Sequence, residues 1–241
     1  MRALSAYVAA EGKPLRIAAM YNVSDIHVFI FSWKKVTGNA RALYDRVVPH
    51  FPNTFFINCD EHTPITDLPA DRVIQRDDSY YYGGQFETAL AHTPVGKPLA
   101  CIVGDVDPEA DWAKIAVNAT TTLNMRRIGI YAPNVDYTWH VARGRRLWGD
   151  YYEVPNTDCT CWFLHPFLVE RLRTLPYFSV SNLGWGIDSI FIEEARRQSL
   201  LVVRDYGTLV RQPKGTAYSS EKARQQMHAL LALYAILPKD N

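Results

Sequence analysis

Cysteine is scarce in this sequence, and the spacing of the few present excludes the common structural zinc site. Four of the 241 residues are cysteines, and Cys59 and Cys101 belong to apolar runs. Cys159 and Cys161 are two residues apart, which puts both on one face of a strand. Since no Cys-x-x-Cys pair is present, the cysteines are predicted to be reduced thiols, those at 59 and 101 buried. Reduced thiols favour a cytoplasmic location.

Long apolar runs are also absent. No segment approaches the roughly 20 consecutive apolar residues that a membrane-spanning helix needs. The stretch 1–10 contains Arg2, Ser5 and Tyr7 and lacks the apolar core of a signal peptide. The sequence therefore predicts a soluble, cytoplasmic protein. A basic cluster, Arg143 with Arg145 and Arg146, is interpreted as a solvated face or, alternatively, as a peripheral contact with anionic lipid or an acidic acceptor.

Neither sign of charge is in excess. Lysine and arginine number 26 and aspartate and glutamate 25, which gives a net charge of +1. Without a basic excess to neutralise phosphates, nucleic acid is excluded as the main partner. What the chain does have is aromatic residues, 12% of the total, which suit sugar stacking and core packing equally well. The length suits one α/β domain.

Strand and helix patterns alternate in the first half of the chain. Three apolar runs are predicted as buried parallel strands: 27–33, 53–58 and 99–103. Helical spacing between the first two predicts a βαβ crossover, and 84–91 and 108–123 are further helix candidates. This order predicts an α/β fold with a mainly parallel sheet, flanked by helices, whose working edge lies at the carboxyl ends of the strands.

The second half is less regular. Strands are predicted at 127–132 and 200–204, and the stretch 151–164 is mixed. Helices are predicted at 167–175, at 188–198 and after Ser219 or Ser220, where an apolar stripe begins. No linker, repeat or low-complexity segment divides the chain, so a single domain is expected.

The most informative motif follows the strand at 99–103. It reads Gly104-Asp105-Val106-Asp107-Pro108 and places two carboxylates one residue apart. Such an oxygen-rich pair suits magnesium or manganese, whose remaining coordination water and a diphosphate can fill. A divalent ion would offset the charge that builds on a nucleoside diphosphate leaving group. The alternative interpretation is structural, with Asp107 as a helix N-cap and Pro108 as the first helical residue.

A second motif, Gly184-Trp185-Gly186-Ile187-Asp188, begins about eighty residues later. Two glycines allow a tight turn that presents the indole, and Asp188 then opens a helix. A carboxylate there is a candidate general base for an acceptor hydroxyl, and helix capping is its structural alternative.

Taken together, the two motifs resemble the GT-A glycosyltransferases, and in particular inverting members in which Gly-Trp-Gly precedes the catalytic acid. The resemblance covers the chain from about His27 to Tyr218 and, outside the motifs, rests on element order alone. It implies a GT-A-like, Rossmann-like single domain over 1–241. Its donor half would span about 15–125 and its acceptor half about 126–241.

The resemblance also implies roles for the motif residues. Asp105 and Asp107 would bind the metal, with Asp105 on the donor diphosphate, and Asp188 would be the catalytic base. Trp185 and Gly186 would contact the acceptor, with Trp185 stacked on a sugar face.

For the nucleotide, the resemblance implies a pocket at the ends of the first two strands. Ser32 and Trp33 would form its floor, and Asp60, with Glu61 beside it, would contact the base or ribose. The loop 77–84 is a weaker candidate for the donor's ribose and phosphates, with a solvated turn as the alternative. Asp158 is expected on the acceptor side, whereas His165 is interpreted as structural.

One departure from the family pattern concerns the third metal ligand, often a histidine from a late segment. Here that segment, 209–218, contains no histidine. Either Gln212 or water completes the metal shell, or Arg211 and Lys214 supply positive charge to the diphosphate directly.

The predicted function is therefore metal-assisted, inverting transfer of a sugar from a nucleotide-diphosphate donor to the hydroxyl of a glycan, glycolipid or other acceptor. Two alternatives stay open. A nucleotidyltransferase also uses paired carboxylates and a metal on a parallel sheet, although the segment 32–38 is a poor phosphate loop. A catalytically silent sugar- or nucleotide-binding scaffold is the other. The oligomeric state is not predicted.

Overall fold

The computed structural model describes residues 20–138, 140, 142–213 and 218–235. The strands are β1 (His27–Trp33), β2 (Thr54–Cys59), β3 (Val73–Gln75), β4 (Leu99–Val103), β5 (Ile128–Val135), β6 (Arg145–Trp148), β7 (Tyr151–Glu153), β8 (Cys161–Leu164) and β9 (Leu201–Val210). The helices are α1 (Thr37–Val47), α2 (Tyr82–His92), α3 (Trp112–Leu123), α4 (Pro166–Leu172), α5 (Tyr177–Val180), α6 (Ile187–Arg197) and α7 (Ser220–Ala235), with short 3-10 turns η2 (Val23–Asp25) and η3 (Ala70–Arg72).

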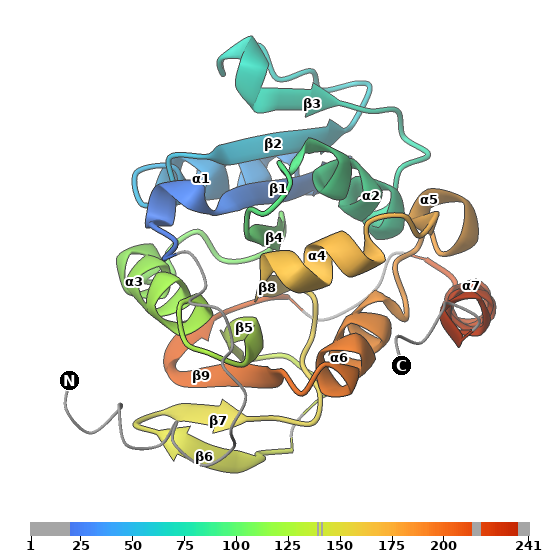
Figure 1. The fold of residues 1–241 in the computed structure, drawn as a ribbon. Coiled ribbons are helices and arrows are strands. Elements are labelled where there is room, and N and C mark those ends of the chain that lie inside the picture. The colour runs from blue at the N-terminus through green and yellow to red at the C-terminus, as the bar shows by residue number, and fades with distance from the viewer. Residues whose placement is uncertain (1–19, 139, 141, 214–217, 236–241) are drawn as a thin grey trace.

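All nine strands form one sheet in the order β3-β2-β1-β4-β8-β5-β9-β7-β6, which Figure 1 shows from top to bottom. β3, β2, β1 and β4 are mutually parallel, as are β5 and β9. β8 runs antiparallel between β4 and β5, and β7 and β6 form an antiparallel hairpin on β9. The predicted α/β fold with a mainly parallel sheet is thus confirmed.

Two apolar layers cover the sheet, because successive residues of a strand face opposite sides. On β1, Phe29 and Phe31 join a core cluster with α2, α4, α6 and α7, whereas Val28 and Ile30 join a second cluster with α1 and α3. All four side chains are fully buried. Figure 1 shows α2, α4 and α6 on the near face of the sheet.

Several predicted boundaries shift for identifiable reasons. The helix predicted from Pro108 begins at Trp112, because the side chain of Asp111 accepts a hydrogen bond from the Lys114 backbone N–H at 3.0 Å and caps it there. The structural interpretation of Asp107 as the N-cap is therefore wrong. The strand predicted at 200–204 continues to Val210, across an irregularity in its pairing with β5.

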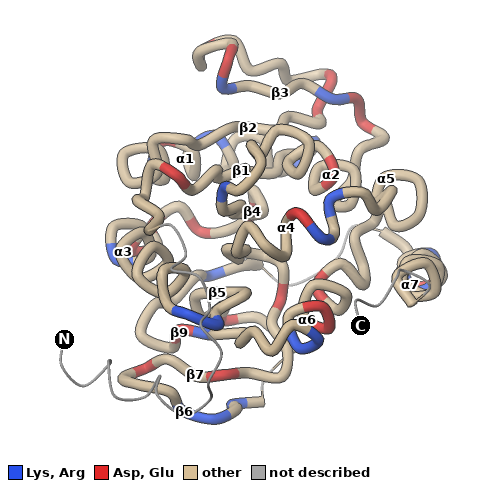
Figure 2. The backbone as a smooth tube through the Cα atoms, viewed as in Figure 1, with Lys and Arg blue, Asp and Glu red and all other residues tan. Residues whose placement is uncertain are grey.

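Charges of both signs are scattered along the described backbone (Figure 2). The basic cluster at 143–146 makes local contacts: Arg145 pairs with Glu153 at 2.8 Å, and the Arg143 guanidinium lies 4.8 Å from the centre of the Tyr206 ring. All four cysteines are free. Among the described residues, no helix combines the length and apolar character that crossing a membrane requires.

Candidate functional site

Seven of the predicted site residues lie at one edge of the sheet. β1, β2, β4, β5 and β9 run in the same direction, so their carboxyl ends meet there, and the reversed strand β8 begins there. In α/β sheets this edge is where ligands bind. The ends of the strands bring seven predicted residues to this edge: Ser32, Trp33, Asp60, Asp105, Asp107, Asp158 and Arg211.

The loop that carries Asp105 and Asp107 is held rigidly. The Asn39 side chain, from the first turn of α1, donates hydrogen bonds to the carbonyls of Gly104 (2.7 Å) and Val106 (2.8 Å), on either side of Asp105. A side chain at Gly104 would come within 2.4 Å of the Phe31 carbonyl, so only glycine fits against β1. The backbone that carries Asp105 is thus held in place without a bound ligand.

Asp105 is half-buried, and burial raises the pKa of its carboxyl group, although hydrogen bonds from Gln212 and a backbone N–H oppose the rise. The Gln212 amide nitrogen lies 3.2 Å from Asp105 Oδ1, and its oxygen accepts from the Thr160 hydroxyl at 3.1 Å. Over the described residues, no lysine or arginine forms an ion pair with Asp105. A half-buried carboxylate held only by neutral groups is a favourable position for a bound cation.

The donor set at this loop fits a hard divalent ion in part. Asp105 and Asp107 offer carboxylate oxygens, but within the described ranges no three His, Cys, Asp or Glu side chains converge as a metal site. Magnesium and manganese commonly bind through one or two carboxylates with water and substrate phosphate as the other ligands, and the pair meets that requirement. The late-segment side chain that contacts Asp105 is that of Gln212.

Asp107 and Arg211 lie on the α3 side of the loop. The Asp107 N–H donates to the Arg211 carbonyl at 2.9 Å, and Asp107 Oδ1 accepts from the Glu109 N–H at 2.9 Å. Both residues line a polar cavity of about 310 Å³, together with Lys114 and others. The Arg211 side chain is exposed. Lys214 lies outside the described residues.

At the ends of β1 and β2, three buried polar side chains form a chain of hydrogen bonds. The Thr37 hydroxyl lies 3.3 Å from the Ser32 hydroxyl and 3.2 Å from Asp60 Oδ2, and Asp60 Oδ1 accepts from the His62 N–H at 3.0 Å. Burial raises the pKa of Asp60, but hydrogen bonds from Thr63, His62 and Thr37 outweigh it and lower the pKa overall. Asp60 is therefore an ionised carboxylate held by hydrogen bonds. Trp33, at the end of the neighbouring strand β1, is half-buried.

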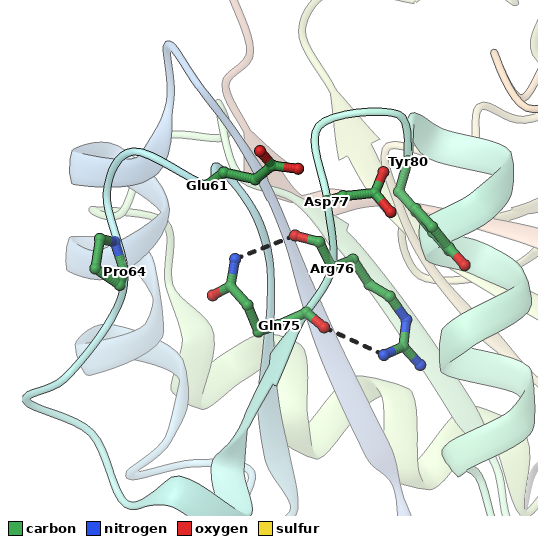
Figure 3. Close-up of a pocket in the computed structure, with 6 residues that line it drawn as sticks. All are labelled: Glu61, Pro64, Gln75, Arg76, Asp77 and Tyr80. Carbon is green, nitrogen blue, oxygen red and sulfur yellow. Dashed lines mark hydrogen bonds between the residues drawn. The ribbon is translucent and has the colours of Figure 1, made fainter.

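A cavity of about 590 Å³ opens next to Asp60, between the loops that follow β2 and β3 (Figure 3). Its lining residues are Glu61, Pro64, Gln75, Arg76, Asp77 and Tyr80. Two of them belong to the 77–84 loop that the sequence marked as a weaker candidate. The side chains of Gln75 and Arg76 each donate a hydrogen bond to the other's backbone carbonyl, at 3.1 and 3.2 Å. These bonds fix the floor of the cavity between Glu61 and Asp77.

On the other side of the edge, Asp158 and Asp188 share a histidine. His140 Nε2 lies 3.7 Å from Asp158 Oδ1 and 3.6 Å from Asp188 Oδ2. Asp158 comes from the loop before β8, Asp188 from the first turn of α6, and His140 from the loop after β5. Gly186 rather than Asp188 is the N-cap of α6, so the capping alternative does not account for Asp188.

A line of contacts connects these acidic residues to Asp105. Asp105 contacts Gln212, Gln212 contacts Thr160, and Thr160 is two residues from Asp158, which contacts His140. The two sequence motifs are thus connected at the sheet edge by side-chain contacts and by the short segment 158–160.

The Gly184–Gly186 turn needs both of its glycines. Their φ angles are +88° and +90°, in the left-handed region that other residues rarely adopt. A side chain at Gly184 would meet the Tyr82 ring, and one at Gly186 would meet Met227 of α7. The half-buried Trp185 indole N–H donates to the Tyr218 hydroxyl at 3.0 Å, which fixes the orientation of the ring.

Sequence reasoning missed two residues at this edge. His140 carried no motif, and only its place shortly after a predicted strand could have marked it. Asp136, at the end of β5, accepts from the Gln212 N–H at 3.0 Å and helps to hold the late segment against the edge. Conversely His165, interpreted as structural, accepts from the Phe167 N–H at 3.2 Å as the N-cap of α4.

Comparison with known proteins supports the fold and leaves the reaction open. No family model and no curated protein sequence matches the chain. Among solved structures, the chain is similar to GalNAc-T7 with UDP, GalNAc and Mn²⁺ (TM-score 0.56, 11% identity, 90% of this chain and 52% of that one). This chain thus spans about half the length of that protein.

A mannosyltransferase from Pyrobaculum calidifontis, in complex with GDP-Man and Mn²⁺, is similar over all of this chain and 72% of its own (TM-score 0.56, 12% identity). A mycobacterial protein is similar over 94% of this chain and 81% of its own (TM-score 0.52, 10% identity). Two of the three are glycosyltransferases, and the likeness establishes a GT-A-like fold for this chain.

Proposed function

We propose that this protein is a glycosyltransferase that moves a sugar from a nucleotide-diphosphate donor to a hydroxyl of a glycan, glycolipid or other acceptor. The observation that carries the proposal is the series of contacts from Asp105 through Gln212 to Thr160, two residues from Asp158, which shares His140 with Asp188. It would place a site for the donor's phosphates beside a carboxylate that can receive the acceptor's proton. The fold of the similar transferases supports the same function.

The donor would bind along the first part of this edge. The nucleoside would occupy the cavity between Glu61 and Asp77, with Trp33 and the buried Ser32–Thr37–Asp60 chain beneath it. The diphosphate would lie at Asp105 and Asp107, which would hold magnesium or manganese. Such an ion, when bound, offsets the charge that develops on the leaving diphosphate. Arg211 and Lys214 would add positive charge there.

The acceptor would bind at Trp185, Gly186 and Asp158, with Asp188 as general base. The acceptor oxygen attacks the anomeric carbon, the bond from that carbon to the diphosphate oxygen breaks, and the acceptor's proton passes to Asp188. Attack from the face opposite the leaving group inverts the anomeric configuration. Asp188 Oδ1 accepts from the Ser189 N–H at 2.8 Å, which fixes the carboxylate plane.

Nucleoside diphosphate binding tests the donor site. Ligand at one hundred times its Kd stabilises a protein by about 2.7 kcal/mol, which for this chain length raises the melting temperature by about 5 to 10 °C. We expect uridine or guanosine diphosphate to give such a shift, larger with manganese or magnesium, in a thermal-shift assay. The double substitution Asp105→Asn and Asp107→Asn should remove the metal-dependent part.

The control is Asp71→Asn, which neutralises an exposed carboxylate in η3 and should change nothing. No response to any nucleoside diphosphate with either metal would refute the glycosyltransferase proposal. A response to nucleoside triphosphates, with pyrophosphate released in the presence of a sugar phosphate, would instead support a nucleotidyltransferase.

A further inference from the structure

We infer that His140 is a positioning residue of the transfer reaction: its imidazole bridges Asp158 and Asp188 and fixes the orientation of the Asp188 carboxylate. The inference rests on the proposed function. One ring nitrogen, Nε2, faces both carboxylates, at 3.6 Å from Asp188 Oδ2 and 3.7 Å from Asp158 Oδ1. The side chains are partly open to solvent, with exposed fractions of 30% for His140, 16% for Asp158 and 21% for Asp188.

Two ionised carboxylates that approach the same ring nitrogen repel each other, and a positive charge between them reduces the repulsion. Burial raises the pKa of Asp158 and the charge of Asp188 adds to the rise, whereas a hydrogen bond with the Thr138 side chain and the charges of His140 and Arg204 oppose it. Asp158 Oδ2 is buried and, within the described part of the chain, has no hydrogen-bond partner. Without the positive charge of His140 the two carboxylates would repel each other, and Asp188 would lose the contact that orients it.

The loop around His140 is held from the sheet, so the bridge does not depend on a bound ligand. Arg204 of β9 is 2% exposed, and its guanidinium donates to the His140 carbonyl at 2.6 Å and to the Asn156 carbonyl at 3.3 Å. The same guanidinium reaches the Thr157 hydroxyl at 3.4 Å, directly before Asp158. One buried side chain thus brings the His140 loop and the Asp158 loop together.

The charged groups that face His140 are Asp158, Asp188 and Arg204. The interaction with Asp188 raises the pKa of His140, burial opposes the rise, Asp158 adds to it, and Arg204 opposes it, with a net increase. A histidine with a raised pKa carries its charge below that pKa and loses it as the pH increases through it. Transfer should therefore decline on the alkaline side as His140 is neutralised.

The bridge itself can be tested by NMR titration of the seven histidines, independently of turnover. The resonance missing in His140→Asn identifies His140. We expect the titration of that resonance to have its pH midpoint above the ordinary histidine value of about 6.5. The midpoint should fall in Asp158→Asn and in Asp188→Asn. His228→Asn, which changes an exposed histidine of α7, should leave it unchanged. A His140 midpoint that neither aspartate substitution moves would overturn the bridge.

The role in transfer is tested by kinetics in the same variants. In His140→Asn, kcat should fall at least about tenfold with the donor KM little changed, and the alkaline decline that His140 causes in the rate profile should disappear. His140→Lys should restore part of kcat and extend the alkaline limb, because the ammonium group stays charged there. Equal pH profiles in wild type and His140→Asn would overturn the positioning role. Absence of transfer and of nucleotide binding in the wild type would instead refute the proposed function, with the NMR result still deciding the bridge.

Discussion

The two ends of the site are built differently. In residues 20–125, strands and helices alternate regularly, and Asp60 and Asp105 directly follow the strands β2 and β4. In residues 126–235, the acceptor-side residues come from loops: His140 after β5, Asp158 before β8, and Asp188 at the start of α6. Strand order brings the first group to the sheet edge, where Thr37 and Asn39 of α1 hold it, whereas loops held by long-range contacts bring the second.

Those contacts are specific. Arg204 holds the His140 and Asp158 loops, and Asn182 joins the Gly184–Asp188 turn to α2 by accepting from the Tyr81 N–H at 3.1 Å and donating to the Ser79 carbonyl at 2.6 Å. The comparison teaches that strand order brings the donor-side residues to the sheet edge, whereas the acceptor-side residues reach the same edge on loops that side chains far apart in the sequence hold together. The two regions should consequently respond differently to substitution.

The largest expected effect separates donor binding from transfer. Asp188→Asn keeps the size of the side chain and its hydrogen bond with Ser189 but removes its basicity. General-base assistance is worth about 10² to 10⁴-fold, so kcat should fall by that factor while the nucleotide-induced thermal shift stays near wild type. Product NMR should show inverted anomeric configuration in the wild type. Full activity in Asp188→Asn, or a retained configuration, would remove Asp188 from the base role.

A smaller effect tests the link between the regions. Gly83, in α2, packs so tightly on the acceptor-side turn that an added methyl group would lie 2.0 Å from the Ser181 carbonyl oxygen. Its N–H donates to the Asn182 carbonyl at 2.7 Å. Gly83→Ala should force the turn away and lower the free energy of unfolding by about 1 to 3 kcal/mol, as overpacking does.

Gly38→Ala is the matched control, because Gly38 is also in a helix but has open space around its Cα. Alanine there should be neutral or stabilise the protein by up to about 1 kcal/mol. Urea unfolding measures both. Equal stability of Gly83→Ala and wild type would mean that the turn is not held by this contact, and the comparison of the two regions would lose its structural basis.

The same contrast explains what the sequence could predict. The apolar runs at 27–33, 53–58 and 99–103 are buried on both faces, so composition alone marks them, and β1, β2 and β4 match within one residue. β3, β6 and β7 are short and partly exposed, so no apolar pattern marks them and they were not predicted. The Asp-x-Asp position follows from the end of β4.

His140 could not be predicted in the same way. Its partners Asp158 and Asp188 are 18 and 48 residues away in the sequence, and no spacing rule connects them. The tight packing at Gly83 is likewise a tertiary property: the sequence marked 77–84 only as a weaker candidate loop, and no pattern in it indicates the Ser181 contact. The roles of all these residues in catalysis stay predictions until the variants are measured.

The smallest expected effect decides which residue replaces the missing late histidine. Gln212 donates to Asp105 through its side chain, whereas Arg211 contacts Asp107 through its backbone and exposes its guanidinium. One neutral hydrogen bond is worth about 1 kcal/mol, so Gln212→Ala should weaken metal-dependent nucleotide binding by about fivefold, and Arg211→Ala by less.

Gln212→Glu should strengthen manganese binding by adding a third carboxylate, with a steeper dependence on pH. Titration calorimetry at constant salt, with Arg224→Ala on α7 as the exposed-arginine control, measures all of these. If Arg211→Ala proved the more damaging substitution, the guanidinium would be supplying charge to the diphosphate, and Gln212 would be left with the structural role of joining Asp105 to Thr160.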